Sequence, residues 1–277
     1  MKRALVMLAA GTLLAGLCAF AASGKPPVDT KLWRLDCGSA QIADLNLFSD
    51  TRAYTGKSMT LSVGCYLIKH GDAYMLWDTG LSAALKGRTV GGATITKTVV
   101  EQLAEIGVKP EQVSIIGISH YHYDHTGQAA AFPGVTLMIG KGDFDALSAT
   151  PPGFGADPTA LKHWIGGPGK SVPVSGDKDV FGDGSVTIID TPGHTPGHHA
   201  LLVKLGSGRT FLLSGDQAHF RENYDSDGVP TFNTNRADTL ASFARFKGLA
   251  ANTNATVIIQ HDPRDIAKLP AFPAAAE

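Results

Sequence analysis

Short runs of hydrophobic residues and one longer amphipathic pattern predict a mixture of strands and helices. Residues 61–68 and 74–77 are largely apolar and flank the turn-forming sequence His70-Gly71-Asp72, which predicts a β-hairpin. From residue 96 to residue 106 the apolar side chains recur at helical spacing, and Gly107 follows where a helix would end. The first part of the chain is therefore expected to combine a hairpin with a helix.

Four more strands and a second helix are predicted further along the chain. Residues 239–249 have the spacing of an amphipathic helix, and residues 150–173, rich in glycine and proline, are expected to form a long surface loop beside a pocket. The four strands are short apolar runs at residues 113–119, 186–189, 210–213 and 256–259. Strands and helices are mixed without an internal repeat, so we expect an α/β fold.

Each of these four strands leads directly into histidine or aspartate. The side chains of this kind that follow them are His120, His122, Asp124, His125, His194, Asp216 and His261. If the carboxyl ends of the strands lie at one edge of the core, all seven side chains converge there. Imidazole and carboxylate groups are the natural ligands of zinc and neighbouring divalent metals. The pattern therefore predicts a metal centre.

Three of the histidines are assigned to a first ion. His120 and His122 alternate at the end of a strand, so both imidazoles can point the same way and bind one ion. His194 would complete this site. In contrast, isolated histidines such as His70 and His163 are interpreted as ordinary surface or core residues.

The remaining residues are assigned to a second ion. Asp124 and His125 follow in the turn and can face an ion about 3.5–4 Å from the first, the separation typical of two-metal hydrolases. His261 would complete this second site. Asp216, which is acidic and lies at a strand end, is suited to bridge the two ions.

The first residues have the layout of a secretory signal. A short basic start precedes an apolar run over residues 4–20, and small residues follow at the spacing that a signal peptidase recognises. We expect a signal peptide over residues 1–21 and one mature domain over residues 22–277, located in the periplasm or secreted. A retained membrane anchor is the alternative, although the apolar run is short for one.

Charge and cysteine content narrow the partners and the compartment. Removing Lys2 and Arg3 from the 24 basic residues leaves 22 against 25 acidic ones, with no basic patch. We therefore expect no nucleic-acid partner, and no membrane contact for the mature chain. An oxidising compartment permits a disulfide between Cys37 and Cys65. Because Cys65 lies in a strand-like run, we interpret it instead as a buried free thiol.

With these residues the chain resembles the metallo-β-lactamase superfamily, over roughly residues 32–265. The resemblance is carried by residues 120–125, 191–198 and 214–216 and by His261. It implies an αββα sandwich that holds two divalent metal ions, with zinc as the expected metal. Asp78, in Trp77-Asp78-Thr79-Gly80, resembles a superfamily aspartate that supports the metal-binding loops without binding metal. An ordinary strand-to-turn signal is the alternative for this segment.

Within the superfamily the chain is most similar to N-acyl-homoserine lactonases, which are quorum-quenching enzymes. Residues 61–67 resemble the segment before the family's Asp-Thr-Gly turn, and residues 222–230 resemble part of the segment before its last histidine. Asp216 matches the family's bridging carboxylate and argues against lactam hydrolysis as the main activity. The resemblance implies that a hydroxide bridging the two ions opens the lactone ring. Asp124 would carry the proton to the leaving alkoxide.

One position departs from this likeness. The lactonases place a tyrosine three residues after the bridging aspartate, where its hydroxyl contacts the substrate carbonyl, and this chain has His219 there. An imidazole can also donate a hydrogen bond, so His219 joins Asp124 as a candidate catalytic residue. Tyr224 is the alternative contact, and a solvated loop position is the simpler interpretation of His219. Candidates for an apolar groove that holds the acyl tail are Ile42, Leu45, Leu47 and Phe48, which otherwise belong to the core.

The same ligand set is compatible with other functions. A promiscuous or organophosphate-type metallohydrolase, or a β-lactamase of the same fold, needs a similar metal centre and differs in the lining of its pocket. A periplasmic metal-binding protein without turnover is the non-enzyme alternative, which the bridging aspartate disfavours. The expected partner is a small-molecule lactone or related ester, and a homodimer is left open.

Overall fold

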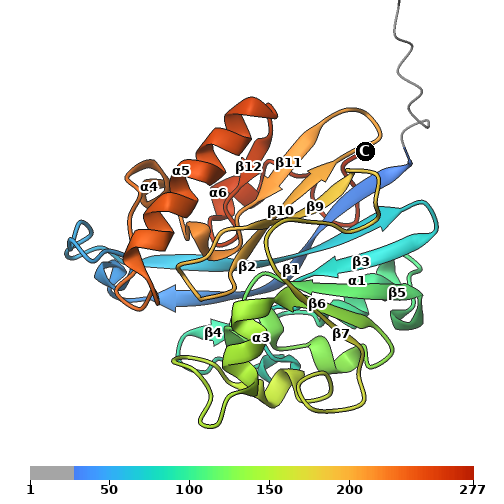
Figure 1. Ribbon diagram of the computed structural model, residues 1–277, viewed down its shortest axis with the longest axis horizontal. Coiled ribbons are helices and arrows are strands. Elements are labelled where there is room, and N and C mark those ends of the chain that lie inside the picture. The colour runs from blue at the N-terminus through green and yellow to red at the C-terminus, as the bar shows by residue number, and fades with distance from the viewer. Residues whose placement is uncertain (1–27) are drawn as a thin grey trace, which may run out of the picture.

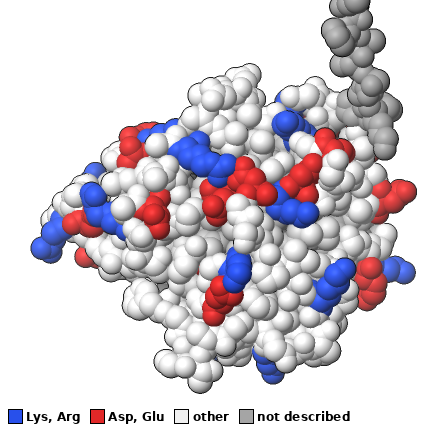
Figure 2. All heavy atoms as spheres, in the orientation of Figure 1, with Lys and Arg blue, Asp and Glu red and all other residues white. Residues whose placement is uncertain are grey.

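Two β-sheets packed face to face form the centre of the structure, a computed structural model that describes residues 28–277 (Figure 1). The predicted signal peptide and its cleavage point lie outside the described residues. Within residues 28–277, no helix is long and apolar enough to cross a bilayer. On the face shown in Figure 2, basic and acidic side chains alternate without a basic patch.

The two sheets differ in size and in the direction of their strands. The larger sheet has the order β4 (Ala93–Thr94), β1 (Thr30–Ile42), β2 (Met59–His70), β3 (Ala73–Trp77), β5 (Val113–Ile118), β6 (Thr136–Gly140) and β7 (Ser171–Val174). The smaller sheet has the order β12 (Thr256–Ile258), β11 (Thr210–Leu213), β10 (His199–Lys204), β9 (Val186–Asp190) and β8 (Lys178–Asp179). Strands β3, β5, β6 and β7 run parallel, as do β11 and β12.

Helices cover the outer face of each sheet. The α-helices are α1 (Val99–Glu105), α2 (Tyr123–Thr126), α3 (Lys141–Ser148), α4 (Arg221–Asp225), α5 (Arg236–Asn252) and α6 (Pro263–Ile266). Short 3-10 helices span Leu45–Phe48, Ala83–Leu85, Pro110–Gln112, Ala129–Ala131, Pro158–Leu161 and Gly215–Gln217. Helix α5 packs Phe246 on the smaller sheet, while α1 and α3 belong to the buried cluster on the outer face of the larger one. A separate buried cluster fills the space between the sheets. The predicted αββα sandwich is confirmed.

Local sequence signals account for most of the predicted elements. The hairpin of β2 and β3 turns at Gly71, whose φ of 56° favours glycine. Helix α1 begins at the N-cap residue Thr98, which forms a capping box with Glu101. Helix α5 extends beyond the predicted residues 239–249, because the side chain of Asn235 caps its first turn.

The segment of residues 150–173 lies largely at the surface, as predicted, but two of its side chains are buried. Leu161 and Trp164 are buried in the core on the outer side of the larger sheet, and the segment ends inside β7. The high content of glycine and proline predicted the irregular backbone correctly. It does not reveal which side chains fold back into the core.

The interpretation of Cys65 as a free thiol is wrong. Cys37 and Cys65 form a disulfide, with their Cα atoms 5.8 Å apart, and both side chains are fully buried. Strand β1, which the hydrophobic pattern did not reveal, lies antiparallel to β2 and pairs Leu35 with Cys65. An irregularity between Asp36 and Ser39 then places Cys37 beside Cys65. The pairing depends on strand register, so neither cysteine's local sequence indicates it.

Removing the disulfide should lower the stability of the mature protein. In the chain-entropy model, a bond across a separation of 28 residues contributes about 3–4 kcal/mol to the free energy of unfolding. The double variant Cys37→Ala/Cys65→Ala should therefore unfold at a clearly lower urea concentration than the wild type. Thiol titration of the denatured wild type is the control. Two free thiols per mature chain would contradict the disulfide.

Candidate metal centre

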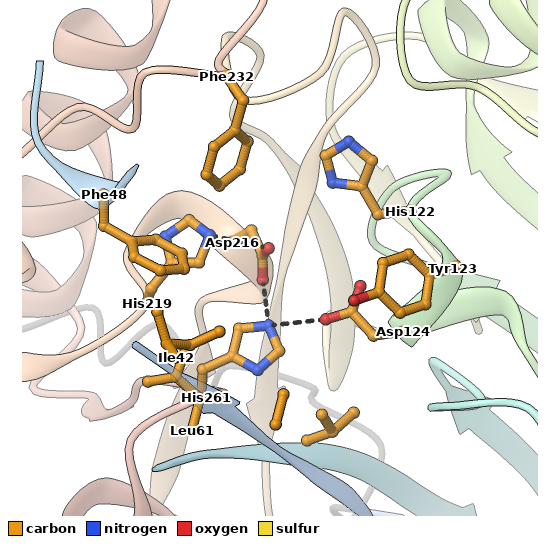
Figure 3. A pocket seen from close by; sticks show the side chains of 12 residues that line it. Ile42, Phe48, Leu61, His122, Tyr123, Asp124, Asp216, His219, Phe232 and His261 are labelled. Carbon is orange, nitrogen blue, oxygen red and sulfur yellow. Dashed lines mark ion pairs between the residues drawn. The ribbon is translucent and has the colours of Figure 1, made fainter. Parts of the chain in front are cut away.

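The structure brings all seven predicted ligand residues together between the ends of the two sheets. They form two groups, each with its candidate ligand atoms within 4.8 Å of one another. The first group is His120, His122, His194 and Asp216, and the second is Asp124, His125 and His261. They follow β5, β9, β11 and β12, as the strand pattern predicted. Figure 3 shows side chains from both groups directed into one space.

The first group presents several imidazole nitrogens to one another. His120 Nε2 lies 2.8 Å from His122 Nδ1, and His194 Nε2 lies 3.0 Å from the same atom. Neutral imidazole has one proton and one lone pair, so these three rings cannot all satisfy one another by hydrogen bonds. A cation between them would accept all three lone pairs. The donor set therefore fits a divalent metal ion.

Hydrogen bonds behind the rings orient three of the histidines. In His125, His194 and His261 the Nδ1 atom lies within 2.9 Å of an oxygen, which assigns the proton to Nδ1. The oxygens are, in the same order, Asp78 Oδ2, Asn233 Oδ1 and the Ser62 carbonyl. In each ring Nε2 is left with its lone pair facing the centre. This is the arrangement that orients histidine ligands in metalloproteins.

The carboxylate of Asp216 lies between the two groups. Its Oδ1 is 2.9 Å from His261 Nε2 and 3.2 Å from His125 Nε2. Its Oδ2 faces the first group, 3.3 Å from His194 Nε2. Within the second group, Asp124 Oδ2 lies 3.6 Å from His261 Nε2 (Figure 3). The two oxygens of Asp216 thus face different groups, so this carboxylate would be able to bind an ion in each.

Burial and charge prepare this centre for cations. Burial and the neighbouring His125 hold the pKa of His120 well below its ordinary value, which keeps its lone pair free. Burial alone would raise the pKa of Asp216, but the surrounding imidazoles, with His261 foremost, hold that pKa well below its usual range. A buried carboxylate surrounded by imidazoles attracts positive charge, which metal ions would supply.

Asp78 supports the centre from behind, as the resemblance implied. Its carboxylate is fully buried and accepts hydrogen bonds from the backbone N–H and the hydroxyl of Ser119, the side chain of Gln260 and Nδ1 of His125. A φ of 59° at Asp78 turns the chain sharply at the end of β3. Asp78 therefore links the loop that carries His120 with the ring of His125.

His219 faces the centre, whereas Tyr224 lies apart from it. The ring of His219 is buried, and its Nε2 lies 3.0 Å from Asp216 Oδ2. The ring of Tyr224 packs on Phe246 instead, with centroids 6.2 Å apart, and does not line the cavity beside the metal groups. Tyr224 is therefore not placed to contact a substrate there.

An apolar cavity of about 230 Å³ opens beside the two groups. Six hydrophobic residues line it, namely Ala40, Ile42, Phe48, Leu61, Val63 and Phe232, and no lysine or arginine of the described chain does. Of the groove candidates, Ile42 and Phe48 line the cavity, Leu45 is buried in the adjoining cluster and Leu47 is half exposed. Two of the four candidates thus line an apolar cavity beside the metal groups, and a role in holding an acyl tail stays a prediction.

Sequence reasoning missed three residues that organise the centre. Asn233 holds His194, and His198 accepts a hydrogen bond from the backbone of Asp216. The buried carboxylate of Asp143 accepts from Thr195 Oγ1 and from the Gly197 and Tyr121 N–H groups, and so ties two ligand loops together. Burial raises its pKa to about 7. Only His198 had a sequence signal, the repeat of Thr-Pro-Gly-His within residues 191–198.

The chain matches known proteins over most of its length. A family model described as "Metallo-beta-lactamase superfamily" matches residues 60–261. The N-acyl homoserine lactonase AttM of Rhizobium radiobacter is 32% identical over 250 residues, which cover 85% of this chain and 94% of AttM.

Solved structures agree in fold. A quorum-quenching N-acyl homoserine lactone lactonase has a TM-score of 0.77 at 24% identity, with 90% of this chain and 99% of that chain covered. AidC, a dizinc quorum-quenching lactonase in complex with a product, has a TM-score of 0.65 at 18% identity, with 90% of each chain covered. Together with the paired His/Asp groups at the sheet ends, the family match shows that this chain belongs to the metallo-β-lactamase superfamily.

Proposed function

We propose that this protein is a metal-dependent hydrolase that opens the lactone ring of N-acyl-homoserine lactones, with two zinc ions in the centre. The observation that carries the proposal is the carboxylate of Asp216, which lies between two His/Asp groups beside an apolar cavity whose lining includes no lysine or arginine. The similarity to AttM, itself an N-acyl homoserine lactonase, supports the same substrate class.

Different residues of the chain are proposed to have different roles in the reaction. Two divalent ions bound to the two groups would acidify a water molecule and polarise the substrate carbonyl. His219 lines the cavity and is placed to donate a hydrogen bond to the carbonyl oxygen. Asp124, the most exposed of the ligand carboxylates, is placed to hold the proton that the leaving alkoxide requires.

The lining of the cavity favours neutral substrates with an apolar tail. Phe48 and Phe232 pack edge to face, with ring centroids 5.5 Å apart, and form an aromatic wall above His219. No cationic side chain lines the cavity to bind a substrate carboxylate, such as β-lactam antibiotics carry. A phosphotriester is also neutral, so an organophosphate-type activity is the second candidate. A comparison of kcat/KM for a lactone and a phosphotriester distinguishes the two activities.

We also propose that the protein acts outside the cytoplasm, in the periplasm or after secretion. The apolar start of the chain motivates this proposal, and the buried disulfide supports it because disulfides persist in oxidising compartments. Nucleic acid is not a proposed partner, and a second copy of the chain is left open.

Metal analysis should give close to two ions per mature chain, with loss of hydrolysis after chelation. Asp216→Ala should lose most of both ions, because this carboxylate faces both groups. Asp124→Asn should keep more metal than Asp216→Ala and still lose most of its kcat, if Asp124 holds the proton. Elemental analysis of the three proteins after metal loading makes the comparison. At most one ion in the wild type would contradict the two-metal centre.

A kinetic panel tests the substrate and the role of His219 together. Acyl-homoserine lactones should show a higher kcat/KM than a cephalosporin or a phosphotriester. His219→Ala should lower lactone kcat/KM by roughly 5- to 150-fold, which corresponds to about 1–3 kcal/mol for one transition-state hydrogen bond. His219→Tyr should recover a large part of the loss.

Tyr224→Phe is the matched control for the His219 variants. It removes a hydroxyl outside the cavity and should leave kcat/KM unchanged. If His219→Ala has no effect, the hydrogen-bond role is wrong. Preference for the cephalosporin or the phosphotriester would reject the lactone assignment, and metal binding without turnover of any substrate would favour the non-enzyme alternative.

A further inference from the structure

His198 lies behind the metal centre and belongs to neither ligand group. It immediately precedes β10, and its side chain is fully buried. Both of its ring nitrogens have defined partners. Nδ1 lies 2.9 Å from the carbonyl oxygen of Thr191, and Nε2 lies 2.9 Å from the backbone nitrogen of Asp216.

These two contacts assign the tautomer of His198. A backbone N–H can only donate a hydrogen bond, so Nε2 must accept from Asp216 with its lone pair. The ring proton is therefore on Nδ1, where the Thr191 carbonyl accepts it. No other acceptor for the Asp216 N–H is present in residues 28–277.

The chain around Asp216 is shaped to allow this contact. Gly215 has a φ of 51°, and a Cβ atom at this position would lie only 2.7 Å from His198 Nε2. A side chain at residue 215 would therefore push the ring away from the Asp216 N–H. Glycine at position 215 lets the ring approach the backbone from which the Asp216 side chain projects.

The residue that follows His198 also contacts the loop that carries His120. The backbone N–H of His199 donates to the carbonyl of Ser119, at a distance of 2.8 Å. Ser119 directly precedes His120, and β5 belongs to the larger sheet while β10 and β11 belong to the smaller one. Residues 198 and 199 thus connect the loop that carries His120 to the turn that carries Asp216.

We infer that His198 is a positioning residue. By accepting a hydrogen bond from the backbone N–H of Asp216, it directs the carboxylate of Asp216 between the two metal groups. The inference rests on the two-metal centre proposed above and does not depend on the substrate. Loss of the acceptor would leave a buried N–H without a partner and free the turn at Asp216 to rotate. Because Asp216 faces both groups, both ions should bind more weakly.

Two substitutions separate the two nitrogens of the ring. In His198→Asn the side-chain amide reaches about as far as Nδ1, so it can keep the contact with Thr191 and loses the acceptor for Asp216. In His198→Gln the side-chain oxygen reaches about as far as Nε2 and can accept from the Asp216 N–H. Thr191→Val is the control, because it removes a hydroxyl beside Nδ1 and leaves the Thr191 carbonyl in place.

The readouts are the affinity for each of two zinc ions, measured by competition with a chelator, and the magnetic coupling of the di-cobalt form. For His198→Asn we expect both ions to bind about 10- to 100-fold more weakly, the range typical of lost partners behind metal ligands, and the coupling to change. His198→Gln and Thr191→Val should remain close to the wild type in both measurements. The melting temperature of each metal-free variant checks that it is folded.

Two outcomes would overturn the inference. Wild-type metal affinities in His198→Asn would show that the acceptor is dispensable. Equal weakening in the asparagine and glutamine variants would show that His198 acts only by filling space. If His198→Asn does not fold, His198→Gln decides alone, since wild-type affinities support the role and weakened ones reject it. Two-ion binding by a wild type that fails to open lactones would reject the proposed function and leave this inference intact.

Discussion

The buried carboxylate of Asp216 is the interaction on which the rest of the site depends. It lies between the two His/Asp groups with one oxygen toward each, and its position is stable only with positive charge or hydrogen-bond donors around both oxygens. Five histidine side chains each place the Nε2 atom close to an oxygen of this carboxylate. The folded chain thus brings negative charge and imidazole ligands into one buried volume, which is an environment suited to divalent ions.

Three buried groups keep this volume in shape, and each connects segments that are distant in the sequence. Asp78 connects the ends of β3 and β5 to His125, and Asp143 ties the loop after β5 to the loop after β9. His198 connects that second loop to the turn of Asp216. Each group forms several hydrogen bonds at once. The positions of the ligand loops are therefore fixed relative to the two sheets, even where the loops themselves are not stiff.

The cavity adds the selectivity that the metal ligands lack. Ligands of this kind are compatible with the hydrolysis of both lactones and phosphotriesters, since each reaction needs an activated water and a polarised oxygen. Apolar residues from β1 and β2 and the aromatic pair of Phe48 and Phe232 form the walls in this chain. Because the lining includes no lysine or arginine, it favours an uncharged ester with a hydrophobic tail over an anionic substrate.

The sequence by itself determined the chemistry of the site, because ligand type and strand-end position are local properties that a hydrophobic pattern reveals. It indicated the seven ligand residues and an α/β fold in this way, while the αββα arrangement was implied by the resemblance to the metallo-β-lactamase superfamily. Tertiary structure decided which other residues serve the site. The disulfide of Cys37 depends on the register of β1 against β2, and the role of His198 depends on a turn that begins 16 residues later. His219 faces the cavity while Tyr224 packs on Phe246, because helix α4 begins after His219 and contains Tyr224. Spacing alone cannot specify the direction of either side chain.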